Sequence, residues 1–160
     1  MVNDNIIGFY YIMLAYHILI PVFCGLVMNG IIFSFNLNSK KELTTLLPPG
    51  HVIGIVWTII FAFLGYVHYL LYKLNNKRNY GSASVVILIL FSLTYPLINA
   101  MNKKNGFFLN LISLILSFLV SLIVMMYSKY IVLFMIPLLV WVSFVNLIVF
   151  YNIIYTKRID

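Results

Sequence analysis

The side chains that could do chemistry in this chain are few and far apart. Its histidines are His17, His51 and His68, and its single cysteine is Cys24. The histidines fall on different apolar runs or at different depths, with no carboxylate or cysteine close in sequence. A metal site needs converging ligands and a nucleophile needs a paired base, so no metal site and no catalytic residues are predicted. The chain is therefore not predicted to be an enzyme, and Cys24, inside an apolar run, is expected to be a buried structural thiol.

The elements that must carry these side chains are membrane helices. Hydrophobic residues make up 64% of the 160 residues and charged residues 8%, and the mean hydropathy is +1.07. A water-soluble domain has about a quarter charged residues, so this chain could not cover itself with a polar surface. Residues 1–160 are predicted to form one all-α domain, an integral membrane bundle of five transmembrane helices.

Five apolar runs define these helices, and none alternates between apolar and polar residues as a membrane β-strand would. The predicted helices are 6–35, 51–74, 82–101, 106–127 and 130–155. The longest connection, 36–49, is polar, ends in a proline pair that can start a helix, and is predicted to act as a lid. The other connections are tight, so consecutive helices should be antiparallel neighbours.

The net charge of +7 comes from short basic clusters between the apolar runs, which excludes the continuous basic stripe of a nucleic-acid-binding protein. Instead, the lipid bilayer is the expected partner. The basic residues on the predicted C-terminal side outnumber those on the other side: Lys40, Lys41, Lys103, Lys104, Lys157 and Arg158 against Lys73, Lys77, Arg78 and Lys129. This bias predicts a cytoplasmic C-terminus, in a bacterial plasma membrane or an organelle membrane.

Polar and small residues recur at helical spacing and predict which face of each run points into the bundle. The stripes are Gly50, Gly54, Trp57, Phe61, Gly65 and His68; Ser92, Tyr95, Asn99 and Asn102; Asn110, Ser113, Ser117 and Ser121; and Trp141, Phe144, Val145, Ile148 and Asn152. Such stripes either join helices by close packing and hydrogen bonds or line a cavity. The cavity interpretation is favoured where glycines and aromatic residues share a face.

One segment of the chain gives a more specific indication than composition or spacing. Residues 48–58, PPGHVIGIVWT, resemble the P-P-G-x-V-x-G-x-V-W-T signature of the translocator-protein (TspO/MBR) family, also called tryptophan-rich sensory proteins or peripheral benzodiazepine receptors. Residues 137–144, PLLVWVSF, are similar to the family's P-Y-L-x-W-x-x-F-A. Pro21 followed by Gly25 in the first run is also similar to the family pattern, so the resemblance extends over nearly the whole chain.

The resemblance implies a five-helix bundle, often a homodimer, with a central pocket closed by the first long loop. Family members bind porphyrins and haem-related tetrapyrroles, so a porphyrin or haem is the implied ligand, and no cofactor is obligatory. The pocket positions that carry over to this chain are Ile53, Gly54, Trp57, Tyr95, Phe107, Leu114, Trp141, Val145 and Ile148. The chain departs from the family in having only two tryptophans.

Together, the stripes and the resemblance predict a translocator-like membrane receptor that binds a hydrophobic planar ligand, a porphyrin or haem-type tetrapyrrole, inside the bundle. Aromatic faces would stack on the macrocycle. The alternative is a structural or assembly subunit of a membrane complex that binds no small molecule.

Overall fold

The computed structural model describes the backbone of residues 4–34, 48–74, 80–101 and 106–156, and side chains within these ranges except at 4–6, 95–97, 99–101, 106 and 152–156. The helices are α1 (Asp4–Ser34), α2 (Gly50–Leu74), α3 (Tyr80–Met101), α4 (Gly106–Tyr127), the short 3₁₀ helix η2 (Ile131–Met135) and α5 (Ile136–Thr156). In the described part of the chain there is no strand, and the all-helical prediction is confirmed. Most of the predicted lid, residues 36–47, lies outside the described residues.

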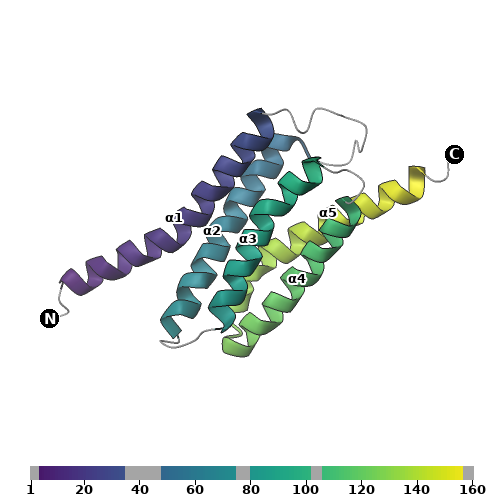
Figure 1. Ribbon diagram of the computed structural model, residues 1–160. Coiled ribbons are helices and arrows are strands. Elements are labelled where there is room, and N and C mark those ends of the chain that lie inside the picture. Colours follow the sequence, from purple (N-terminus) through teal and green to yellow (C-terminus); the bar gives the residue numbers. More distant parts are fainter. Residues whose placement is uncertain (1–3, 35–47, 75–79, 102–105, 157–160) are drawn as a thin grey trace.

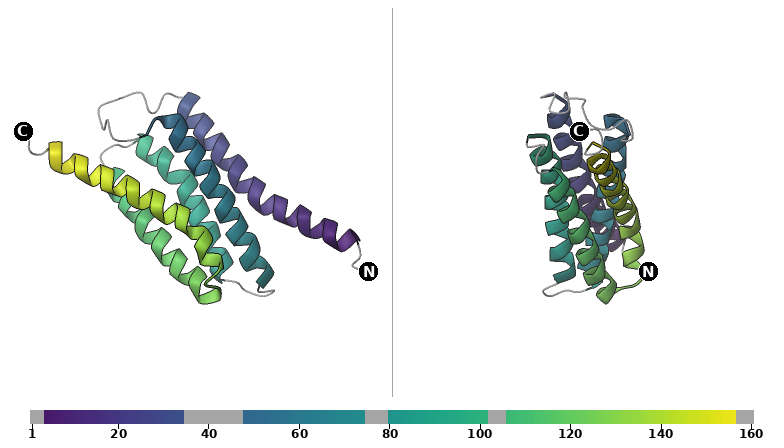
Figure 2. Two further views of the ribbon diagram at one scale, coloured as in Figure 1. Left: turned by 180° about the vertical axis from the view of Figure 1, so that it is seen from behind. Right: turned by 90° about the vertical axis from the view of Figure 1, so that its right-hand side faces the viewer.

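The helices form an elongated bundle in which consecutive helices run antiparallel (Figure 1). The most extensive interface joins α1 and α2, and α2 also contacts α3 and η2. Further along the chain, α3 packs on α4 and α4 on α5. The N-terminal end of α1 and the C-terminal end of α5 project from opposite sides of the bundle, as two further views show (Figure 2). Helix α2 is therefore the element around which the N-terminal half of the bundle is organised.

The helices meet the requirements for a membrane bundle. Four described spans are long and apolar enough to cross a bilayer: Ile7–Ser34, Gly50–Leu74, Phe107–Tyr127 and Ile131–Tyr151. The apolar stretch described in α3, Tyr80–Thr94, is shorter. Large apolar side chains cover the outside, including Phe33 at 78% and Met126 at 85% exposure. An outer surface of this kind is stable against lipid tails and unfavourable in water.

Prolines explain where two of the helices begin. The carbonyl of Pro49 accepts hydrogen bonds from the N–H of Val52 (2.9 Å) and the N–H of Ile53 (3.2 Å), so α2 starts directly after the proline pair, as predicted. In contrast, the run 130–155 was predicted as one helix, and this is wrong at its start. Pro137 has no N–H to reach the carbonyl of Leu133 four residues earlier, and that carbonyl accepts instead from the N–H of Ile136. The preceding residues therefore tighten into the 3₁₀ helix η2.

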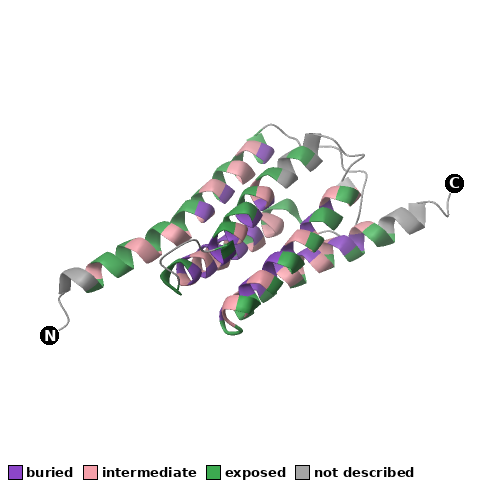
Figure 3. Cartoon of the chain, turned by 60° about the horizontal axis from the view of Figure 1, so that its bottom comes forward, coloured by how far each residue is buried: buried purple, intermediate pink, exposed green. Residues whose placement is uncertain are grey.

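Buried positions lie on the inward faces of α2, α3, α4 and α5, with exposed positions outside (Figure 3). The core is a cluster of aliphatic and aromatic residues in which α2 contributes Trp57, Phe61 and Leu64, and α5 contributes Leu138 and Val142. The core continues into the interfaces that hold the candidate site.

Candidate ligand site within the bundle

The close approach of α1 and α2 is made by a proline and a glycine. Pro21 lies inside α1 and has no N–H to donate to the carbonyl of His17, four residues earlier. On α2, a Cβ added to Gly65 would overlap this carbonyl oxygen and would lie 2.9 Å from the Cα of Ile18. Gly65 is therefore required, because the backbone of α1 occupies the space where a side chain would stand.

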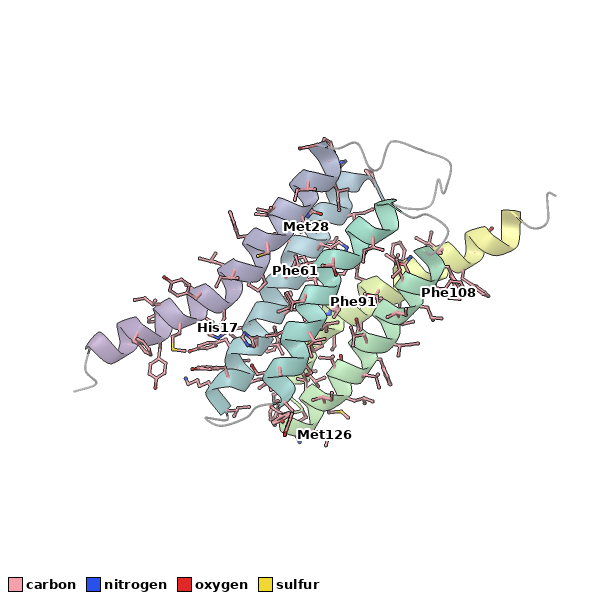
Figure 4. All side chains as sticks on the ribbon, in the orientation of Figure 1. His17, Met28, Phe61, Phe91, Phe108 and Met126 are labelled. Carbon is pink, nitrogen blue, oxygen red and sulfur yellow. The ribbon has the colours of Figure 1, made fainter. Side chains whose placement is uncertain are left out.

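A second glycine contact lies further along the same interface and holds an aromatic pair in place. The ring of Phe61 packs against Gly25 of α1, where an added Cβ would be 2.5 Å from the ring carbon Cδ2. The ring centroid of Phe61 lies 5.6 Å from that of Trp57, one turn earlier on α2. Trp57 is only 5% exposed, so its indole belongs to the core of the bundle. Figure 4 shows Phe61 between α1 and α3.

Gly54 is different from these two glycines because it has room around it. The nearest atoms to an added Cβ would be Nδ2 and Cγ of Asn29 on α1, at 3.6 and 3.9 Å, which is ordinary van der Waals contact. Gly54 and the neighbouring Ile53 are half-buried, and the hydroxyl of Thr58 donates to the carbonyl of Gly54 at 2.9 Å. A Cβ could therefore be added at Gly54, one turn before Trp57, without displacing its neighbours.

The polar stripe predicted on α4 does face inward. Asn110, Ser113, Ser117 and Ser121 are each at most 5% exposed. The hydroxyls of Ser117 and Ser121 donate to the backbone carbonyls four residues earlier, at 2.7 Å in each case. On α3, Ser92 is 1% exposed. These small polar side chains let α3, α4 and α5 approach one another closely.

An asparagine links α4 to α5. The amide Nδ2 of Asn146 donates to the carbonyl of Asn110 at 3.0 Å and to the carbonyl of Val142 at 2.8 Å. Several other buried polar atoms have no hydrogen-bond partner among the described residues: Oγ of Ser92, Oγ of Ser113, Nε1 of Trp141 and Oδ1 of Asn146. The inside of the bundle therefore offers hydrogen-bonding atoms from three helices.

The inward face of α5 differs from the predicted stripe. Its most buried positions are Leu138, Val142, Ile148 and Asn146, so Ile148 of the predicted stripe is buried, whereas Phe144 is 40% exposed. Trp141 lies at the edge of this face, half-buried, with its ring centroid 5.8 Å from that of Phe144. Asn146 was missed although it is a polar residue in an apolar run, which is the signal that identified the other stripes.

The predicted pocket residues do not all gather in one place. Trp57 belongs to the core cluster, and Ile53, Leu114 and Trp141 pack against it. Val145 is half-buried and Ile148 is 8% exposed on α5, and Phe107 is half-buried in the first turn of α4, beside the ring of Phe108. Tyr95 lies in α3, but its side chain is outside the described residues. The structure thus connects four predicted residues through the core, while their role in binding stays a prediction.

Two of the histidines meet, contrary to the expectation that none of the three converge. The ring centroids of His17 on α1 and His68 on α2 are 4.8 Å apart. His51 is exposed in the first turn of α2. No group of three or more His, Cys, Asp or Glu residues that could hold a metal ion occurs among the residues that the structure describes. The His17–His68 contact could not be read from the sequence because it depends on the register between α1 and α2.

A hollow on the outside of the bundle has a volume of about 470 Å³ and lies along α1. It is almost wholly apolar and is lined by Tyr16, Leu19, Ile20, Val22, Phe23, Cys24 and Leu26. Cys24 is half-buried at this outer face, and the buried environment expected for its thiol is wrong. This hollow is separate from the predicted pocket, since none of the predicted pocket residues lines it.

Comparison with known proteins gives one match. The family model described as TspO/MBR matches residues 17–154. No curated protein and no solved structure matches the chain. The match covers α2, α3 and α4 and most of α1 and α5, and it includes Gly25, Gly54, Gly65, Trp57 and Trp141.

Proposed function

This chain belongs to the TspO/MBR family and is a translocator-like membrane protein, and we propose that it acts as a receptor that binds a planar tetrapyrrole, a porphyrin or haem, inside its helix bundle. The site would lie between the first turns of α2 and the inward faces of α4 and α5. It would bind without catalysis by protein side chains. A homodimer and a cytoplasmic C-terminus remain predictions from the sequence.

The observation that carries the proposal is the arrangement at the start of α2. Trp57 is a large, rigid aromatic surface held in the core by Phe61. One turn earlier, Gly54 leaves room where the other inward glycine of α2, Gly65, leaves none. In the proposed complex the flexible side chain of Asn29 would move away from Gly54, and the flat macrocycle would stack on the aromatic surface.

Buried polar atoms inside the bundle that lack hydrogen-bond partners give a second argument for a tetrapyrrole ligand. A buried donor or acceptor without a partner destabilises a protein by about 1–3 kcal/mol. The hydroxyl oxygens of Ser92 and Ser113 and the indole N–H of Trp141 lack partners in the described part of the chain. The pyrrole nitrogens or carboxylates of a porphyrin can donate to or accept from such atoms.

Titration of the purified protein in lipid nanodiscs with protoporphyrin IX tests the proposal. Binding should shift the Soret band and quench tryptophan emission, because the porphyrin absorbs where indole emits. The variants Trp57→Phe and Trp141→Phe each leave one tryptophan and report on the two positions separately. Empty nanodiscs correct for porphyrin that partitions into lipid.

A matched control is Phe118→Leu, which removes an aromatic ring from the outer face of α4, where Phe118 is 57% exposed. This variant should bind like the unaltered protein. If saturating porphyrin leaves both tryptophans bright and the Soret band unshifted from that in empty nanodiscs, the proposal is wrong. The structural or assembly role would then be the better explanation.

A further inference from the structure

A second set of chemistry-bearing side chains lies towards the other end of α2. The imidazoles of His17 and His68 are 4.8 Å apart between ring centroids and inclined by 39°, so they do not stack flat. The rings of Tyr69 and Tyr72 lie 5.6 and 5.5 Å from that of His17. Figure 4 shows His17 on the side of α1 that faces α2. Two imidazoles with aromatic neighbours therefore meet at one helix interface.

The packing of α1 on α2 explains why the two histidines meet. Gly65 lets the backbone of α1 at His17 come into contact with α2. His68 follows Gly65 by three residues and so lies on the same face of α2. The position of both rings is thus fixed by a backbone contact and not by flexible side chains alone.

One imidazole is held in the form that a metal ligand requires. Nδ1 of His17 lies 2.7 Å from the carbonyl oxygen of Met13. A carbonyl oxygen can only accept, so Nδ1 carries a proton, and a ring that carries this single proton has a free lone pair on Nε2. Histidines that bind metals are commonly oriented in this way, by donating the other ring N–H to a backbone carbonyl.

The distance between the rings also suits a shared ion. Two imidazoles bound to one tetrahedral metal ion, with metal–nitrogen bonds of about 2.0–2.1 Å, have ring centroids roughly 5 Å apart. The observed separation of 4.8 Å is close to this value. A hydrophobic contact between two side chains would not require either nitrogen to be oriented.

The pair lies within reach of ions from water. His68 precedes Lys73 by five residues, which is about 7.5 Å along the helix axis. The Nζ of Lys73 lies 4.8 Å from the ring centroid of Tyr10. Lysine and tyrosine at a helix end are typical of the headgroup region, so this end of α2 lies close to the aqueous phase.

We propose that His17 and His68 together bind one divalent transition-metal ion of the class that prefers imidazole, Cu²⁺ or Zn²⁺, with water as the remaining ligands. Carboxylate-preferring ions such as Mg²⁺ and Ca²⁺ are excluded by the all-nitrogen donor pair. The site is independent of the proposed tetrapyrrole site, since its two histidines are not among the residues proposed for that site. A metal ion bound to both histidines would cross-link α1 and α2.

The test uses the full chain in nanodiscs without a histidine tag, titrated with Zn²⁺ by calorimetry and with Cu²⁺ by electron paramagnetic resonance. We expect one ion per chain, nitrogen hyperfine structure from the imidazoles, and a raised melting temperature on metal binding. His17→Asn and His68→Asn should each weaken Zn²⁺ binding at least tenfold and lower the number of imidazole nitrogens coupled to Cu²⁺ from two to at most one. The matched control His51→Asn changes the exposed histidine of α2 and should bind within twofold of the unaltered protein.

Circular dichroism without metal identifies any variant that fails to fold, in which case the other histidine variant decides. His17→Cys supplies a different metal ligand at the same place and should retain more Zn²⁺ binding than His17→Asn. The proposal is overturned if the unaltered protein binds no stoichiometric ion. It is equally overturned if His17→Asn and His68→Asn bind as well as the His51 control.

Discussion

The two ends of the α1–α2 interface each contain a glycine of α2, but they differ in how much room there is beside that glycine. At one end, Gly65 faces the backbone of α1 at His17, and nothing larger than hydrogen fits there. At the other end, Gly54 faces the side chain of Asn29 across an ordinary contact distance. Both glycines lie on one inward stripe of α2, yet the first has no room for an added carbon atom and the second has room for a methyl group.

The difference shows that a small residue in a membrane helix has two separate uses. Where the facing atoms are backbone, glycine allows close helix packing, and its loss must separate the helices. At Gly54 the facing atoms belong to the flexible side chain of Asn29 at ordinary contact distance, so a small group can be added there. Which use applies depends on the partner helix, and substitutions at the glycines can separate the two.

The largest effect is expected from Gly65→Ala. The added methyl overlaps the backbone of α1, which cannot rotate away as a side chain can, so the free energy of unfolding should fall by roughly 2–3 kcal/mol, at the upper end for overpacked sites. Thermal unfolding in nanodiscs, followed by circular dichroism, measures this. A melting temperature equal to that of the unaltered protein would contradict the close contact.

Gly25→Ala should have an intermediate effect. The new methyl meets the ring of Phe61, which can shift by displacing its neighbours, so the expected loss is about 1–2 kcal/mol. Combining it with Phe61→Leu should recover part of the loss, because the smaller side chain makes room for the methyl. Strict additivity of the two changes would show that the residues do not touch.

Gly54→Leu is expected to act on binding more than on stability. The leucine side chain would occupy the space beside Trp57 and weaken protoporphyrin IX binding by about tenfold, while the melting temperature stays close to that of the unaltered protein. The Soret titration described above measures the affinity. Unchanged affinity with intact folding would remove this end of α2 from the site.

Trp57→Phe keeps an aromatic wall but reduces its area. Binding of protoporphyrin IX should weaken by roughly 0.5–1.5 kcal/mol, as for the loss of one aromatic contact. Tryptophan emission from the remaining Trp141 follows the titration. An effect no larger than that of Phe118→Leu would place Trp57 in a packing role only.

The smallest effect is expected from Gly30→Ala, which serves as the matched control for the other glycines. An added Cβ at Gly30 of α1 meets no atom within 4 Å. Alanine also favours helix more than glycine, so the unfolding free energy should stay unchanged or rise by up to about 1 kcal/mol. A clear loss of stability would mean that Gly30 faces a partner outside the described residues.

Much of the architecture could be predicted because it depends on local patterns. Apolar runs without alternation predicted five helices, and Pro49 predicted the start of α2. Serine at every fourth position in α4 predicted its buried face, since a polar side chain in lipid must find protein. The predicted start of the last helix is wrong because Pro137, which is present in the sequence, tightens the preceding turn into η2.

The candidate site was less predictable because its members belong to different helices. Ile53, Trp57, Leu114 and Trp141 meet at one core, but the sequence placed Phe144 on the inward face of α5, where Asn146 lies instead. The bond from Asn146 to the backbone of Asn110 on α4 holds this side chain at the interface between α4 and α5. The polar Asn146 within an apolar run marks this face of α5, but its partner on α4 cannot be read from the sequence of α5.

The sequence by itself determined that this protein lies in a membrane, that its apolar runs form α-helices, and which family it belongs to. Those properties follow from composition, from the need to pair every backbone N–H and C=O within a lipid-embedded segment, and from motifs within single helices. Only the tertiary structure determines that backbone atoms of α1 occupy the space beside Gly65, that Gly54 has room for a small group, and that His17 and His68 meet. These depend on the register and distance between helices, which close packing fixes and no single helix encodes.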